Sequence, residues 1–246
     1  TGAYINLGVS LKALGRTNDA VAAYEQAVRK GHPPMPQAFG NLATSLHELG
    51  RVAEALDAAR KGVGLDPTYA HGYNILGTLL RPGHSGPGDK EECIQAYKTA
   101  LAIAPSFADA SLNLAGVLVE VERFEEALEV VLKARGLDGG DSRLFIEWFN
   151  LKRRVAEYSE WDEDVKRLAE MLEGQMQILP KLSIQPFQAV TYPLDDELVS
   201  RVTQHFAAYV RRRAGLMMVG GSLDVAYHSL WTHKSPLRVG YVSADF

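Results

Sequence analysis

One pattern recurs four times within the first 140 residues, and a unit repeated at this length restricts the fold to a stack of similar pieces. Each copy carries a leucine that is followed at once by a small residue and, four positions later, by a second leucine. The first leucines of the four copies are Leu7, Leu42, Leu76 and Leu114. Later in each copy come two further small residues, which are Ala20 and Ala27 in the first.

The small residues have a steric reason, because residues four apart share one face of a helix and a small side chain lets a second helix approach. Gly15 and Gly50 fall where the first helix of a copy must end, a position that often needs a left-handed residue. Pro67 and Pro105 mark joints between copies, since proline cannot continue a helix. The pattern resembles the tetratricopeptide repeat (TPR), a helical hairpin of about 34 residues.

We therefore expect an all-α TPR superhelix over residues 1–140, with four repeats at about 2–34, 36–68, 70–106 and 108–140. The third repeat carries an insertion within residues 81–89, which contain two prolines and three glycines and are expected to form a loop. A first residue that is threonine, with the pattern in phase by Tyr4, suggests a chain that is cut at its start.

The pattern changes after residue 140. Residues 141–213 are expected to hold capping and connector helices, at 143–158, 162–178 and 196–213, with Asp195 as the N-cap of the last. Between them, residues 179–194 contain three prolines and are expected to be extended. Residues 214–246 are expected to be a linker followed by a buried strand at Leu237–Ser243.

Composition excludes several classes of function. The formal net charge of −4 comes with no basic stripe, which argues against nucleic acid as a partner. No run of 18 apolar residues predicts a membrane span. Cys93 is the only cysteine and occupies a small-residue position, so a buried packing role is expected rather than reactivity. The seven histidines lack metal-ligand or triad spacing, so neither a catalytic nor a metal site is predicted.

An asparagine precedes the first leucine in three of the four repeats: Asn6, Asn41 and Asn113. Repeat 3 has Ile75 at this position, with Asn74 one residue earlier. Amides carry both a donor and an acceptor, so one amide per repeat can pair with the backbone of an extended peptide, or can brace neighbouring repeats. Both interpretations stay open. A clamp for a chaperone carboxyl terminus is disfavoured, because Ile5, Val9 and His71 occupy positions where such clamps carry lysine and asparagine.

Beyond the repeats, the chain is similar to O-linked N-acetylglucosaminyltransferases, closest to the plant SECRET AGENT-like branch. The resemblance rests on the order of the TPR array, residues 161–176, residues 182–198 (LSIQPFQAVTYPLDDEL) and residues 236–246 (PLRVGYVSADF). It implies that Leu237–Ser243 begins a Rossmann-like glycosyltransferase lobe. It also implies transfer of GlcNAc from UDP-GlcNAc, without a metal, to Ser or Thr of cytoplasmic and nuclear proteins.

By that resemblance Asn6, Asn41 and Asn113 become contacts for extended segments of protein substrates. The family's catalytic histidine motif would begin after Phe246, so no catalytic residue and no donor site can be assigned to this chain, and the chain alone is expected to be inactive. Two alternatives remain: a SPINDLY-type protein O-fucosyltransferase, which shares a similar terminal strand, and a TPR adaptor without enzymatic activity. The oligomeric state is not predicted.

Overall fold

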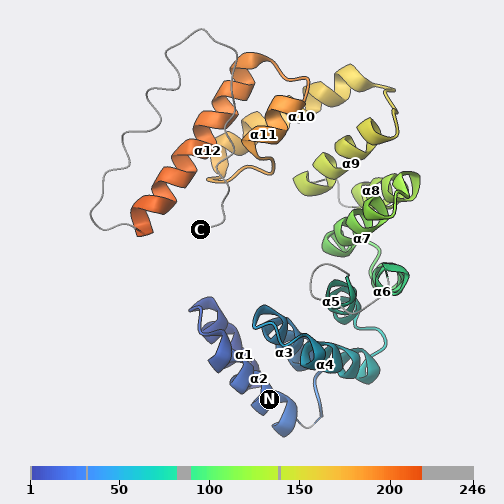
Figure 1. The fold of residues 1–246 in the computed structure, drawn as a ribbon, viewed down its shortest axis with the longest axis vertical. Coiled ribbons are helices and arrows are strands. Elements are labelled where there is room, and N and C mark those ends of the chain that lie inside the picture. Colours follow the sequence, from blue (N-terminus) through green and yellow to red (C-terminus); the bar gives the residue numbers. More distant parts are fainter. Residues whose placement is uncertain (1, 32, 82–89, 138–139, 218–246) are drawn as a thin grey trace. The chain divides into compact units, whose positions relative to one another are not determined.

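The structure is a computed structural model that describes residues 2–31, 33–81, 90–137 and 140–217. In these ranges every regular element is an α-helix (Figure 1). The chain divides into two compact units, Thr1–Glu173 and Gly174–Phe246. The predicted strand at Leu237–Ser243 lies outside the described residues, as does most of the loop predicted at 81–89.

Eight helices of the first unit form four antiparallel hairpins in chain order. The hairpins are α1 (Gly2–Ala13) with α2 (Thr17–Lys30), α3 (Pro36–Glu48) with α4 (Val52–Leu65), α5 (Ala70–Leu80) with α6 (Lys90–Ile103), and α7 (Ala108–Glu120) with α8 (Phe124–Leu137). The four hairpins correspond to the four predicted repeats, so the expected helical solenoid is confirmed for this part of the chain.

The hairpins stack with the first helix of each on the inner side. Each first helix packs on the second helix of the preceding hairpin and also on the preceding first helix, as α5 does on α4 and α3. Among the described residues, the second helices α2, α4, α6 and α8 do not pack on one another. Because the first helices approach more closely, they form the inner layer of the curved stack and the second helices form the outer layer (Figure 1).

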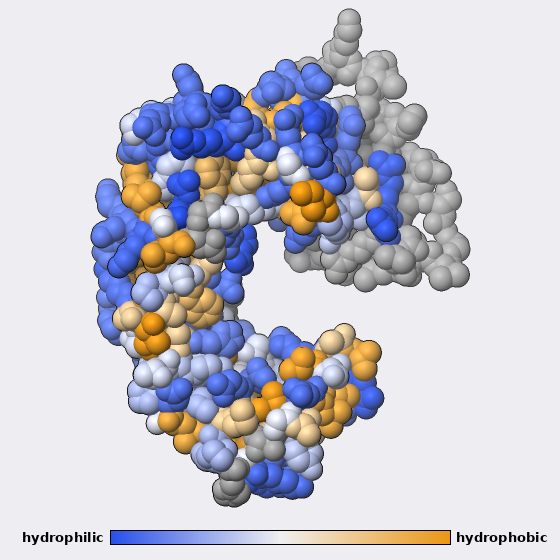
Figure 2. Space-filling view, turned by 180° about the vertical axis from the view of Figure 1, so that it is seen from behind, coloured by the Kyte–Doolittle hydropathy of each residue, from blue (hydrophilic) through white to orange (hydrophobic). Residues whose placement is uncertain are grey.

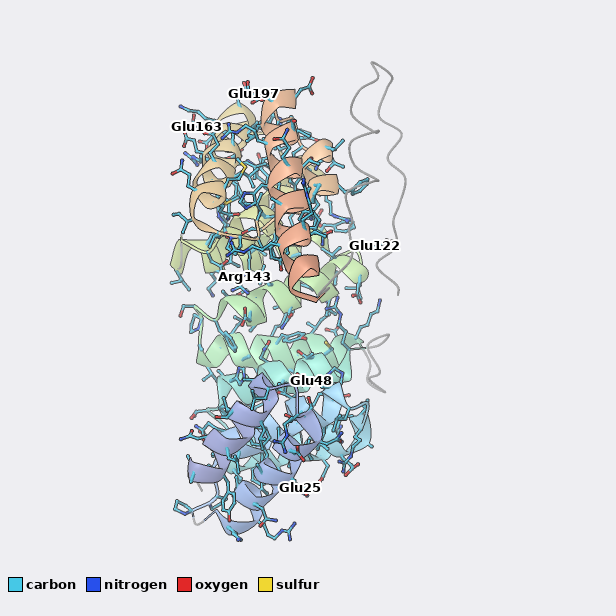
Figure 3. All side chains as sticks on the ribbon, turned by 90° about the vertical axis from the view of Figure 1, so that its left-hand side faces the viewer. Glu25, Glu48, Glu122, Arg143, Glu163 and Glu197 are labelled. Carbon is cyan, nitrogen blue, oxygen red and sulfur yellow. The ribbon has the colours of Figure 1, made fainter. Side chains whose placement is uncertain are left out.

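The turns inside the hairpins follow one design. Gly15 and Gly50 both have φ of 73°, as their predicted left-handed role requires. In the fourth repeat the same position holds Glu122, at φ 60°, where a side chain is strained. Figure 3 labels Glu122 at this turn between α7 and α8.

The residue before each outer helix is an arginine in these three hairpins, and it pairs with an acid in the helix's first turn. Arg51 Nη2 lies 2.7 Å from Glu54 Oε2, and Arg123 Nε lies 2.6 Å from Glu126 Oε1. Arg16 makes the equivalent pair with Asp19. Because both partners are exposed or half-exposed, solvent screens each pair and it contributes little to stability.

The first hairpin differs from the others in what its inner helix covers. Leu7 is 49% exposed, whereas the equivalent Leu114 in the fourth hairpin is 1% exposed. Val9 on α1 and Leu14 in the turn after it are also exposed, and apolar colour is visible at the lower end of the molecule in Figure 2. The reason is the stacking rule: a first helix buries its leucine only against a preceding hairpin.

After the fourth repeat the first unit continues into helices α9 (Ser142–Arg154) and α10 (Trp161–Ile178). Helix α9 packs on both α7 and α8, which is how each earlier inner helix packs. The helices predicted at 143–158 and 162–178 therefore exist. The first of them ends four residues earlier than predicted, because Ala156 takes a left-handed φ of 54° and closes the helix.

The second unit contains the end of α10, a short helix α11 (Pro186–Thr191) and helix α12 (Asp196–Met217). The prediction that residues 179–194 are extended throughout was wrong, because α11 forms within them. Its first residue is Pro186, which suits the first turn of a helix, and Gln185 and Gln188 form a reciprocal cap. Asp195 caps α12 as predicted, since its Oδ1 accepts from Leu198 N at 2.7 Å.

The segment before α11 is held to α10 by one side chain. Gln175 Nε2 donates to Ser183 Oγ at 2.8 Å, and Ser183 N donates to Gln175 Oε1 at 2.9 Å. Leu182, Ile184 and Tyr192, in the same segment, are buried. The stretch 182–198, which carries part of the resemblance to glycosyltransferases, is thus a folded element of the second unit.

Candidate peptide-binding surface

The inner layer of the four hairpins carries the predicted amides. Asn6 is exposed on α1 and Asn41 is half-buried on α3. In the described part of the chain neither side chain makes a hydrogen bond, whereas the backbone carbonyl of Asn6 accepts from Ser10 Oγ at 3.0 Å. The two amides therefore keep their full donor and acceptor capacity for a ligand.

Asn113 on α7 behaves differently, because it reaches across to the preceding repeat. Its Nδ2 donates to Asn74 Oδ1 on α5 at 3.0 Å. Asn74 is only 8% exposed. Between the two interpretations left open by the sequence, this contact braces neighbouring repeats.

The same contact changes the role of the third repeat. Ile75, which replaces the asparagine there, is buried. Asn74 uses its Oδ1 to hold Asn113, and its Nδ2 donates to no other group in the described residues. Asn74 is buried, so in the third repeat its amide serves to hold Asn113. The sequence shows Asn74 one position out of register, but only the inter-helix contact reveals its partner.

Charged side chains between successive inner helices are paired with one another. Lys12 Nζ lies 2.8 Å from Glu48 Oε1, which joins α1 to α3. Arg81 pairs with Glu120 between α5 and α7. Arg143 Nη1 lies 2.7 Å from Asp109 Oδ1, which joins α9 to α7, and Figure 3 labels Arg143 at the start of α9. Because these cations already have carboxylate partners, the inner layer presents amides and apolar groups more than free charge.

The interior of the third hairpin contains two buried groups with raised pKa values, and they serve packing. Cys93 Sγ donates to the carbonyl oxygen of Gly77 at 3.1 Å, and burial raises the pKa of the Cys93 thiol to about 11. Burial also raises the pKa of Tyr97 to about 12. The Tyr97 hydroxyl is 3.1 Å from Thr78 Oγ1. A thiol and a phenol held neutral in a dry interface have no role as nucleophile or base.

No group of three or more potential metal ligands exists in the described ranges. Within the same ranges no helix is long and apolar enough to cross a membrane.

Helices α9 and α10 form a fifth hairpin that the repeat pattern did not reveal. Phe149 lies 34 residues after Ala115, and Trp161 lies 34 residues after Ala127, so both occupy positions that are small in the other hairpins. Their rings stack, with centroids 4.8 Å apart. The constant spacing of 34 was the available signal, and it was hidden because bulky residues replace the small ones.

A buried ion pair accompanies the ring stack. Lys152 on α9 is 4% exposed, and its Nζ lies 2.7 Å from Asp164 Oδ2 on α10. The same Nζ donates to the Ser159 carbonyl at 2.7 Å and lies 2.9 Å from Glu157 Oε2. Hydrogen bonds from Ser159 and Lys152 lower the pKa of Glu157 to about 2. One lysine thereby fixes the turn between the two helices.

Comparison with known families agrees with this geometry. Two tetratricopeptide repeat models match, one over residues 5–70 and the other over residues 88–145, and together they take in half of the chain. The chain belongs to the tetratricopeptide repeat family. Among solved structures, it is similar to Pseudomonas aeruginosa pilF, with a TM-score of 0.62 and 18% identity over 89% of this chain and 92% of that one. At that identity the likeness shows the fold alone.

The curated relatives are diverse. The chain is 26% identical over 166 residues to the human protein O-mannosyl-transferase TMTC3 and 33% identical over 92 residues to the Hsp70-Hsp90 organizing protein of Triticum aestivum. It is 29% identical over 135 residues to a probable UDP-N-acetylglucosamine–peptide N-acetylglucosaminyltransferase, SPINDLY, of Hordeum vulgare. These matches cover 68%, 37% and 54% of this chain but only 15%, 15% and 14% of the relatives. What is shared is therefore a TPR protein-interaction region.

Proposed function

We propose that this chain is the substrate-binding TPR region of a UDP-GlcNAc:protein Ser/Thr O-GlcNAc transferase, and that its inner layer captures extended segments of acceptor proteins. The observation that carries the proposal is the set of inner-layer amides, because the side chains of Asn6 and Asn41 make no hydrogen bond with any residue that the structure describes. Amides that pair with a peptide backbone tolerate any side chain, as a transferase with many protein substrates requires.

Two further observations support a transferase over an adaptor. The segment at 182–198, which resembles O-GlcNAc transferases, is folded in the second unit and held by Gln175. The similarity to SPINDLY extends over 54% of the chain, and that protein bears a glycosyltransferase name. The donor in this proposal is UDP-GlcNAc, bound outside the described residues and without a metal, and the acceptors are cytoplasmic and nuclear proteins.

Two alternative functions, a protein O-fucosyltransferase and a non-enzymatic adaptor, are each supported by one observation. The resemblance of residues 236–246 keeps a SPINDLY-type protein O-fucosyltransferase as an alternative. The similarity to an Hsp70-Hsp90 organizing protein favours a non-enzymatic adaptor. Against a chaperone-tail clamp, Lys12 and Arg81 are both occupied by carboxylates of the neighbouring inner helix.

The test is peptide capture by a variant in which Asn6, Asn41 and Asn113 are all alanine. Fluorescence anisotropy with a Ser/Thr-rich acceptor peptide is expected to show weaker binding, by roughly 0.5–1.5 kcal/mol for each lost hydrogen bond. The matched control replaces three amides of the outer layer, Asn18, Gln26 and Gln95, by alanine and is expected to bind as the wild type does. Equal affinity of the two triple variants would reject the role of the inner amides.

Three additional measurements test the role of Asn74, the preference for the acceptor peptide and the absence of sugar transfer. In the otherwise wild-type chain, Asn74→Ala is expected to weaken binding to a smaller extent, because it removes the brace of Asn113. A chaperone carboxyl-terminal peptide is expected to bind no better than the acceptor peptide, and a clear preference for it would favour the adaptor. Incubated with radiolabelled UDP-GlcNAc and acceptor, the chain alone is expected to transfer no sugar, and turnover above a buffer blank would overturn the assignment as a binding region.

A further inference from the structure

The turn of the fifth hairpin contains an open notch with aromatic walls. It has a volume of about 610 Å³ and is lined by Tyr158, Glu160, Trp161, Asp162, Glu163 and Arg167. The ring centroids of Tyr158 and Trp161 are 5.1 Å apart, and the ring planes stand at 86° to each other. Phe149 stacks on Trp161 and fixes that ring, while Tyr158 is 55% exposed. Two nearly perpendicular aromatic walls therefore reach the solvent at this turn.

The rim of the notch is acidic. Glu160 and Asp162 are exposed and have no cationic partner in the described part of the chain. Glu163, which Figure 3 labels on α10, lies 3.8 Å from Arg167. The positive end of the α10 dipole offsets about half a charge at this end of the helix. A surplus of negative charge remains beside the aromatic walls.

The one cation in the lining is divided between two carboxylates. Arg167 Nη1 lies 3.9 Å from Asp164 Oδ1, and that oxygen is buried without a hydrogen-bond partner. Lys152, a second nearby cation, is buried and already contacts Asp164, Glu157 and the Ser159 carbonyl. Neither cation is therefore free to neutralise Glu160 and Asp162.

The walls are also held in place before any ligand arrives. Glu160 has a φ of 55°, and Ala156, at the other end of the turn, has a φ of 54°. Non-glycine residues keep such angles only where the surroundings impose them. Here Lys152 contacts both Glu157 and the Ser159 carbonyl, and these two residues lie between Ala156 and Glu160 in the chain. A site that is ordered in advance loses less entropy on binding.

We propose that this notch binds the guanidinium group of an arginine side chain in a bound polypeptide. A guanidinium stacks on aromatic faces, donates to carboxylates in a planar fork, and is more weakly hydrated than an ammonium group, so arginine fits this combination of walls and rim. The notch would recognise one side chain of the bound polypeptide, whereas the inner amides would pair with the polypeptide backbone. It would give the chain a preference for basic segments, and it does not depend on the amides.

The experiment follows the Trp161 indole N–H signal of the ¹⁵N-labelled chain by NMR, assigned with a Trp161→Phe variant. The probe is acetyl-Gly-Arg-Gly-amide, and its neutral twin carries citrulline in place of arginine. The arginine probe is expected to shift the signal saturably, and the citrulline probe is expected to leave it unchanged. The probe is too short to span two repeats, so failure of the inner-amide proposal would not affect the result.

Two variants test whether the aromatic walls and the acidic rim are responsible for arginine binding. Tyr158→Ala, and separately the pair Glu160→Gln with Asp162→Asn, are each expected to weaken arginine binding roughly two- to fivefold. Glu170→Gln is the matched control, since it removes one exposed carboxylate from the same helix away from the notch, and it is expected to bind as the wild type does. Equal shifts with both probes, no saturable shift, or unchanged arginine affinity in both variants would overturn the proposal.

Discussion

The third and fifth hairpins solve the same packing problem in opposite ways. In the third, Gly77 and Cys93 bring the two helices so close that a thiol meets the backbone carbonyl of the facing helix at 3.1 Å. In the fifth, Phe149 and Trp161 hold the corresponding positions and stack on each other. The small-residue interface is repeated along the solenoid, whereas the aromatic one occurs once in the residues that the structure describes and leaves an open turn. The four repeated hairpins provide the proposed surface for a peptide backbone, and the fifth hairpin provides the proposed notch for an arginine side chain.

The largest expected effect concerns the aromatic interface. Phe149 is fully buried, so Phe149→Ala removes the stack under Trp161 and leaves a cavity. We expect the free energy of unfolding, measured by urea denaturation, to fall by about 3–5 kcal/mol. Leu132→Ala, at a 54% exposed position on α8, is the control and is expected to change it by less than about 0.5 kcal/mol. Similar losses in the two variants would mean that the fifth hairpin does not depend on its ring stack.

A smaller effect is expected at the small-residue interface. A Cβ atom added at Gly77 would lie 2.7 Å from the Tyr97 ring, which is itself buried. Gly77→Ala is therefore expected to lower the free energy of unfolding by roughly 1–3 kcal/mol.

The control is Gly136→Ala on α8, where no atom lies within 4 Å of the added Cβ. It is expected to raise the free energy of unfolding by up to about 1 kcal/mol, since alanine is the better helix former. Equal changes in the two variants would contradict the close approach of α5 and α6.

The smallest effect concerns the turns. Glu122 occupies the left-handed position that Gly15 and Gly50 hold in the first two hairpins. Glu122→Gly removes strain of about 1–2 kcal/mol but adds the backbone entropy of glycine, so a net gain of about 0.5–1 kcal/mol is expected. Gly50→Ala should produce a loss of similar size. Thermal unfolding of both variants checks this, and a destabilised Glu122→Gly would refute the strain.

The sequence predicted the repeated part of the fold because each small residue and turn glycine has a local steric role. It predicted the two helices of the fifth hairpin but not their register with the repeats, since aromatic residues there replace the small ones. Helix α11 was missed because Pro186 was interpreted as a breaker, although proline also starts helices. Both predictions failed at positions where the residue type, aromatic or proline, is compatible with two different local structures.

The candidate site was predicted less completely than the fold. The amides at Asn6, Asn41 and Asn113 follow from their register with the leucines, and their positions on inner helices follow from the repeat. The hydrogen bond between Asn74 and Asn113 depends on how α5 and α7 are rotated against each other. The notch at Tyr158 and Trp161 depends on the left-handed backbone of Ala156 and Glu160. Neither residue is a glycine, so no sequence pattern predicts this conformation.

The central claim is that extended polypeptide lies along the inner helices of the four hairpins. The most direct test is photo-crosslinking of a Ser/Thr-rich acceptor peptide that carries a diazirine, followed by mass spectrometry of the labelled chain. We predict labels on α1, α3, α5 and α7 that disappear when unlabelled peptide competes. Competable labels confined to α2, α4, α6 and α8 would contradict the claim.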